Sequence, residues 1–176
     1  MALNVETGSG SASADSYASL ADATAWHAAR GATAWAAIAS DALREQALVR
    51  ATQYMVQVYR QRWAGRRMTA TQALDWPRYM VPVIDAPGGY GLYPAYYPQD
   101  TVPAEVRNAC CELALSAAAG DLAPNIGRLK ESVEIGPIKT TYSATAPAFT
   151  RYRAVDNMLQ PFMAGGSGFS IALSRA

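Results

Sequence analysis

One stretch of the chain gathers arginines and aromatic side chains at spacings that suit binding chemistry. Residues 44–78 contain seven arginines against only two acidic residues, Glu45 and Asp75. The cationic and aromatic candidates are Arg60, Arg62, Trp63, Arg66, Arg67, Trp76 and Arg78. Guanidinium groups neutralise phosphates and aromatic rings stack on bases, so the pattern is typical of a groove for single-stranded DNA.

The same residues also suit an interface between protein subunits. Arginine makes bidentate bonds to carboxylates, and both arginine and tryptophan are enriched at the centres of protein interfaces. With 15 Lys+Arg against 14 Asp+Glu, the net charge of +1 gives no general attraction to nucleic acid or to an anionic membrane. We therefore predict a subunit interface at these positions, with single-stranded DNA binding as the alternative.

Catalytic groups are not assembled anywhere in the sequence. His27 is the only histidine, and its place beside Trp26 in an amphipathic helix favours a satisfied or surface side chain. The adjacent Cys110 and Cys111 are expected to be buried as small apolar residues. There is no glycine-rich phosphate loop, dinucleotide fingerprint or pair of metal ligands at the usual spacing. We expect no enzyme activity, no cofactor and no metal.

The elements that position these residues are predicted to be mostly helical. Of the 176 residues 36 are alanine, which favours close-packed helices in one domain over residues 1–176. Caps and apolar spacing predict helices at 19–30, 40–61, 103–120 and 153–163, with a shorter helical turn at 69–74. The expected fold class is mainly α, a small bundle of about four helices with one β-hairpin and extended N- and C-terminal arms.

Four segments outside the helices complete this expectation. They are an N-terminal arm at 1–18, a Tyr- and Pro-rich loop at 79–101, a β-hairpin at 128–143 and a C-terminal arm at 165–176. The loop is either a partner surface or packed on the domain. The C-terminal arm alternates Phe169, Ile171 and Leu173 with small residues, as a strand that pairs with its own fold or with a neighbour. Both arms are expected to become ordered only on assembly.

No segment has the features of a leader or a membrane span. The first basic residue is Arg30, and no run of about 18 apolar residues occurs. We expect a soluble chain that is made in a cytoplasm, with no membrane partner.

Several short motifs together resemble a known family. They are residues 16–23, residues 46–54, the run Gln-Ala-Leu-Asp-Trp-Pro-Arg at 72–78, and residues 133–138. Over nearly the full length the chain resembles phage and prophage proteins labelled DnaT-like single-stranded-DNA-binding proteins, which are also similar to head-tail connector (adaptor) proteins. The run at 72–78 is the most specific of these motifs.

The connector resemblance implies a structural role in the neck of a tailed-phage virion. It implies a helical adaptor assembled as a homo-oligomeric ring, commonly twelve-fold, after synthesis in the bacterial host cytoplasm. The ring would contact the portal protein above and a neck or tail-terminator protein below. Genomic DNA would pass through the bore without sequence-specific contact. The loop at 79–101 is shorter in many relatives, so contacts made there would be specific to this chain.

Overall fold

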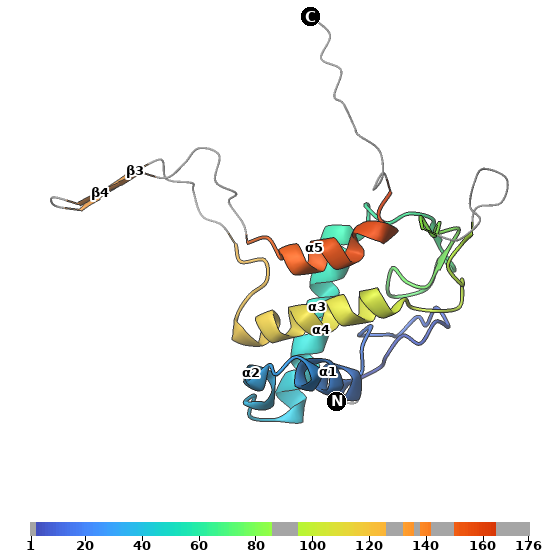
Figure 1. The fold of residues 1–176 in the computed structure, drawn as a ribbon, viewed down its shortest axis with the longest axis horizontal. Coiled ribbons are helices and arrows are strands. Elements are labelled where there is room, and N and C mark those ends of the chain that lie inside the picture. The colour runs from blue at the N-terminus through green and yellow to red at the C-terminus, as the bar shows by residue number, and fades with distance from the viewer. Residues whose placement is uncertain (1–2, 86–94, 126–131, 136–137, 142–149, 165–176) are drawn as a thin grey trace, which may run out of the picture.

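The computed structural model describes residues 3–85, 95–125, 132–135, 138–141 and 150–164 (Figure 1). Its helices are α1 (Leu20–Ala29), α2 (Thr33–Ala36), α3 (Asp41–Tyr59), α4 (Ala104–Ala119), α5 (Arg153–Leu159) and the 3₁₀ turn η1 (Gln160–Phe162). Its strands are β1 (Arg66–Arg67), β2 (Arg78–Tyr79), β3 (Ser132–Ile135) and β4 (Ile138–Thr141). The prediction of a mainly α fold with one β-hairpin, β3–β4, is confirmed.

The helix boundaries follow from local caps. Ser19 and Asp22 form the predicted capping box of α1, each side chain bonded to the other's backbone amide. The hydroxyl of Ser40 accepts a bond from the amide of Leu43 and begins α3. Pro103 immediately precedes α4, which Gly120 ends. The predicted helices at 19–30, 40–61 and 103–120 therefore form within one or two residues of their expected bounds.

The core lies where α3 and α4 cross, with α1 and α5 packed against α4 (Figure 1). Ala47, Ala51 and Ala109 are fully buried, and their small side chains let the two long helices approach closely. Cys110 and Cys111 are buried free cysteines, as expected, and burial raises the pKa of both thiols.

His27 is a satisfied core histidine. Its ring stacks on Trp35 at 4.8 Å between centroids, and its Nε2 lies 3.0 Å from the carbonyl oxygen of Cys111. Burial lowers the pKa of His27, since the charged imidazolium is disfavoured away from water.

The expectation that the N-terminal arm is ordered only on assembly is wrong for residues 3–18. The Glu6 carboxylate is buried and accepts bonds from the amides of Gly8, Gly10 and Ser11 at 2.8, 3.1 and 2.7 Å. A buried carboxylate with several amide donors organises a glycine- and serine-rich loop that has few apolar side chains. Tyr17 follows this loop and lies in the core, so the segment is part of the domain.

The predicted helical turn at 69–74 does not form. The amide of Thr69 donates to Oε1 of Gln72 at 2.9 Å, and the amide of Gln72 donates to the hydroxyl of Thr69 at 3.1 Å. The side-chain amide of Gln72 donates to the carbonyls of Leu74 and Pro77. These local side-chain bonds compete with helical backbone bonds and hold the segment in a bent, non-helical conformation.

The remaining predicted segments are described in part. The ends of the loop at 79–101 are paired, with the amide of Val83 bonded to the carbonyl of Ala95 and that of Tyr97 to Val81. The helix predicted at 153–163 shortens to α5 and η1, as Pro161 requires. The C-terminal arm at 165–176 and the turn between β3 and β4 lie outside the described residues.

Candidate nucleic-acid interface

The short strands β1 and β2 form the centre of the candidate site. They pair antiparallel, with Arg66 opposite Tyr79 and Arg67 opposite Arg78. Residues directly opposite in an antiparallel pair have side chains close enough to interact. Arg66 and Tyr79 are both exposed, and the Tyr79 side chain is 50% accessible. An open arginine and an open aromatic ring therefore lie side by side.

Further exposed side chains surround this pair. Arg67 is exposed and donates to the carbonyl of Gln72 at 3.2 Å, while Met68 and Met80 are exposed large apolar residues. We call Arg66, Arg67, Tyr79 and Met80 the outer set. Met80 has a positive φ of 59°, which an L-residue rarely adopts, and it directly follows β2.

The two tryptophans predicted at this interface lie in the core instead. Trp76 is 0% exposed, with Trp63 edge-on at 5.8 Å and Phe162 edge-on at 5.5 Å between ring centroids. Trp63 is also buried, and the neighbouring backbone pairs with residues 162–164. Neither ring is open to a base or to a neighbouring subunit, so the prediction of interface roles for Trp63 and Trp76 is wrong. Their large apolar area is used in packing against η1.

Arg78 is likewise structural. It is 6% exposed and donates to the carbonyls of Ala64, Gly65 and Asp75 at 2.7, 2.9 and 3.1 Å. Burial lowers the pKa of the Arg78 guanidinium, and the nearby Asp75 carboxylate opposes that shift. Its predicted place at an interface is therefore also wrong. We call Trp63, Trp76 and Arg78 the inner set.

A side chain of the N-terminal segment holds the backbone just before β2, where the inner and outer sets meet. The hydroxyl of Tyr17 accepts bonds from the amides of Asp75 and Trp76 at 2.9 and 3.3 Å. Burial raises the pKa of Tyr17 well above its usual value, and the Asp75 carboxylate adds to the shift. Arg60, half exposed, forms an ion pair with the buried Asp75 at 2.9 Å. Arg60 is therefore held by an internal partner.

Arg62 lies at the border of the site, beside α5. Its guanidinium carbon is 5.2 Å from the ring centroid of Tyr59, and its Nη1 is 4.0 Å from Oδ1 of Asp156. Tyr59 donates to the same oxygen of Asp156 at 2.8 Å, and burial together with this bond raises the pKa of Tyr59. Two open hollows meet at Arg62 and Asp156, with volumes of about 320 and 540 Å³.

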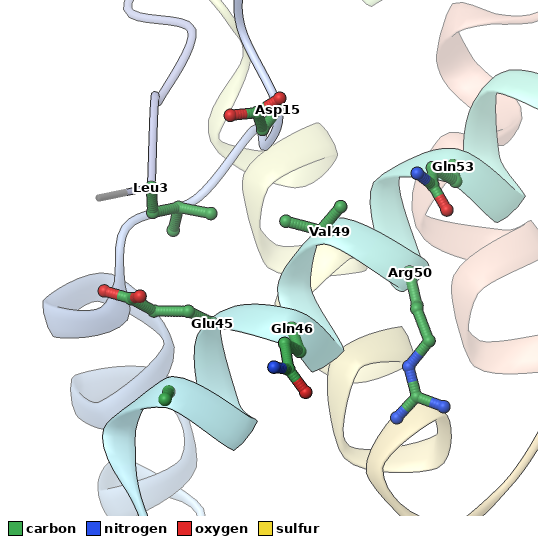
Figure 2. A pocket seen from close by; sticks show the side chains of 8 residues that line it. Leu3, Asp15, Glu45, Gln46, Val49, Arg50 and Gln53 are labelled. Carbon is green, nitrogen blue, oxygen red and sulfur yellow. The ribbon is translucent and has the colours of Figure 1, made fainter. Parts of the chain in front are cut away.

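A separate groove runs along the first half of α3. Figure 2 shows Leu3 and Asp15 of the N-terminal segment across from Val49, with Arg50 directed away from them. The groove has a volume of about 600 Å³, and its other lining residues are Ala42, Glu45, Gln46 and Gln53. Its lining mixes short apolar side chains with both signs of charge, so it has no consistent preference for phosphate.

The described part of the chain offers no metal centre and no membrane span. Over those residues no three or more His, Cys, Asp or Glu side chains come together as metal ligands. None of the helices there combines the length and apolar character that crossing a bilayer requires.

Comparison with known proteins assigns the family. Residues 1–176 match the model of the family described as "Putative DnaT-like ssDNA binding protein". The chain belongs to this DnaT-like family. No curated protein and no solved structure matched it. The match supports the DnaT-like part of the expected resemblance, and its description names no connector.

Sequence reasoning missed Tyr79, the exposed aromatic residue of this DnaT-like protein's site. It was counted with the tyrosines of the loop at 79–101, although it directly follows Arg78. The run Trp76-Pro77-Arg78-Tyr79 carried no alternating signal, because Trp76, Pro77 and Arg78 are all buried and Tyr79 is the first exposed residue. The three arm residues predicted at an interface, Phe169, Ile171 and Leu173, lie outside the described residues.

Proposed function

We propose that this protein binds single-stranded DNA without catalysing a reaction, through the outer set and the neighbouring Arg62. The observation that carries the proposal is the pairing of exposed Arg66 with exposed Tyr79 across β1 and β2. A ring that stacks on a base beside a guanidinium that neutralises a phosphate is the basic unit of sequence-tolerant single-strand binding. The family description agrees with this activity.

The charges around the site favour a compact binding surface. Arg60 and Arg62 have acidic partners in Asp75 and Asp156, whereas no ion pair of Arg66 or Arg67 occurs among the described residues. The net charge of +1 adds little long-range attraction, so binding depends on these local groups. A small number of phosphates would be neutralised, and the salt dependence would be correspondingly shallow.

The test measures the affinity of a labelled oligonucleotide at several salt concentrations by fluorescence anisotropy. On single strands log K falls against log salt with a slope of about −0.7 for each neutralised phosphate, so Arg66→Ala with Arg67→Ala should reduce the slope by about 1.4. The matched control is Arg50→Ala with Arg107→Ala, which removes two exposed arginines outside the site. Absence of binding at low salt, or equal loss in both variants, would reject the proposal.

A second candidate is the head-tail adaptor ring, with the portal protein and a tail-side neck protein as partners in the virion. The observation in its favour is a set of exposed large apolar side chains in β2 and the chain that follows it, namely Tyr79, Met80, Ile84 and Tyr96. Exposed apolar side chains gathered on one segment are typical of a protein partner. In this role the arm at 165–176, with Phe169, Ile171 and Leu173, would bind a neighbouring subunit or the portal.

Electron microscopy of the particle neck distinguishes the two candidates. The adaptor role predicts a ring of this mass between portal and tail, and deletion of residues 165–176 should leave a folded subunit that no longer assembles onto heads. Infectious particles formed by the shortened protein would argue against the arm's role. A neck without this protein would remove the adaptor candidate altogether.

A further inference from the structure

A hollow at Arg62 combines aromatic rings, two arginine side chains and a carboxylate. Its volume is about 320 Å³, and its lining residues are Tyr54, Val58, Tyr59, Arg62, Thr150, Arg151, Tyr152 and Asp156. We call it the tyrosine hollow. A second hollow of about 540 Å³ on the other side of Arg62 and Asp156 contains the amide side chains of Gln61, Asn157 and Gln160.

The rings of the tyrosine hollow are fixed in place. Tyr54 and Tyr152 meet edge to face at 5.4 Å between centroids, and both are partly exposed. Tyr59 is held below them, edge-on to Tyr54 at 6.5 Å and bonded to Asp156. Edge-to-face contact is a favoured arrangement of aromatic rings, so the hollow presents an apolar wall to a flat ring.

The two charged groups at the border remain accessible. The side chain of Arg62 is 54% exposed and that of Asp156 is 38% exposed, and their closest approach is a long 4.0 Å. Arg62 therefore keeps N–H donors for a phosphate. Asp156 accepts one bond from Tyr59, and a carboxylate has about four acceptor sites in all, so it can accept another.

We propose that the tyrosine hollow receives one base of the bound strand and selects bases that carry an exocyclic amino group. This inference rests on the proposed single-stranded DNA binding. The base would lie against Tyr54 and Tyr152, with its phosphate at Arg62 and its amino group donating to Asp156. Cytosine offers an N4 amino donor at the position where thymine has the O4 acceptor, which a carboxylate repels.

The experiment compares labelled (dC)20 and (dT)20 on the full chain by fluorescence anisotropy at low salt. The wild-type protein should bind (dC)20 at least about tenfold more tightly, as expected for one hydrogen bond to a charged acceptor. Asp156→Asn should bring the ratio close to one and strengthen (dT)20 binding, because a negative charge is removed and the amide can donate to O4. Tyr59 can still donate to the oxygen of the new amide.

Asp100→Asn is the matched control, since Asp100 is exposed and precedes α4. It should leave the ratio unchanged. Equal affinity of the wild-type protein for the two oligonucleotides, or a ratio that survives Asp156→Asn, overturns the selectivity inference. In that case binding that depends on Arg66 and Arg67 still supports the proposed function. If neither oligonucleotide binds, the proposed function and this inference are both rejected.

Discussion

Arg66 and Arg78 occupy neighbouring register positions of the same two-stranded pair, yet their environments are opposite. Arg78 is almost completely buried and bonded to three backbone carbonyls, whereas Arg66 is exposed beside Tyr79. One arginine-rich segment therefore contains both kinds of arginine. The inner set supports the chain path of residues 64–78, and the outer set is exposed.

The inner set ties this segment to other parts of the chain. Trp76 packs against both Trp63 and Phe162, which joins the middle of the chain to its described C-terminal end. Tyr17 joins the same place to the N-terminal segment through Asp75 and Trp76. The outer set therefore adjoins a part of the domain that is tied both to the N-terminal segment and to Phe162.

Trp76→Ala should have the largest effect on stability. Deletion of a fully buried indole leaves a cavity next to Trp63 and Phe162, at a cost of about 3–5 kcal/mol in the free energy of unfolding. Urea denaturation followed by circular dichroism measures it. A loss of about 0.5 kcal/mol or less, the range of substitutions away from such packed sites, would contradict the placement of Trp76 in the inner set.

Arg78→Ala should rank second. It leaves the carbonyls of Ala64, Gly65 and Asp75 without their donor, and we expect a loss of about 2–3 kcal/mol. Arg78→Lys should not restore the stability, because one ammonium cannot reproduce the planar fork of donors. The same denaturation experiment on Arg66→Ala supplies the comparison, and an equal loss there would remove the distinction between the two sets.

Gly65→Ala tests how the two sets are joined. Gly65 has a φ of +67°, and a Cβ there would collide with the carbonyl oxygen of Tyr79. Gly31 has a similar φ of +65° with open space around it, so Gly31→Ala carries only the backbone penalty of about 1–2 kcal/mol. Gly65→Ala should therefore be the more destabilising of the two, and it should also weaken DNA binding. Equal stability of the two variants would show that the carbonyl of Tyr79 does not lie this close to Gly65.

Tyr79→Ala should have the smallest effect on stability and a clear effect on binding. An exposed side chain away from the core changes the free energy of unfolding by about 0.5 kcal/mol or less. Loss of one stacking ring should cost about 1–3 kcal/mol in the affinity for single-stranded DNA. Tyr79→Phe keeps the ring and should retain most of the affinity in the same anisotropy measurement. A Tyr79→Ala protein with wild-type affinity would exclude stacking at this position.

The long helices could be predicted because their signals are local. Ser19 with Asp22, Ser40 and Pro103 mark helix starts, and the alanine spacing marks the faces that meet. The caps act within a few residues and need no tertiary contact. The helical core of the fold was therefore accessible from sequence.

Only part of the candidate site could be predicted from the sequence, for a different reason. Whether Trp76 faces inward depends on Tyr17 and Phe162, which are far away in sequence, and no local pattern contains that information. The buried Glu6 gave no signal either, because its loop looks like a flexible glycine- and serine-rich linker. The arginine cluster is visible in the sequence, but its division into inner and outer sets required the tertiary structure.

The burial of the indole rings has a practical consequence for spectroscopy. Trp35, Trp63 and Trp76 are buried, and Trp26 is covered by the guanidinium of Arg30 at 3.0 Å from the ring centroid. Quenching of tryptophan emission, a common sign of base stacking, would therefore be weak even when DNA is fully bound. The same emission should shift to longer wavelength on unfolding, so the intrinsic fluorescence of this protein reports its folded state and not its occupancy.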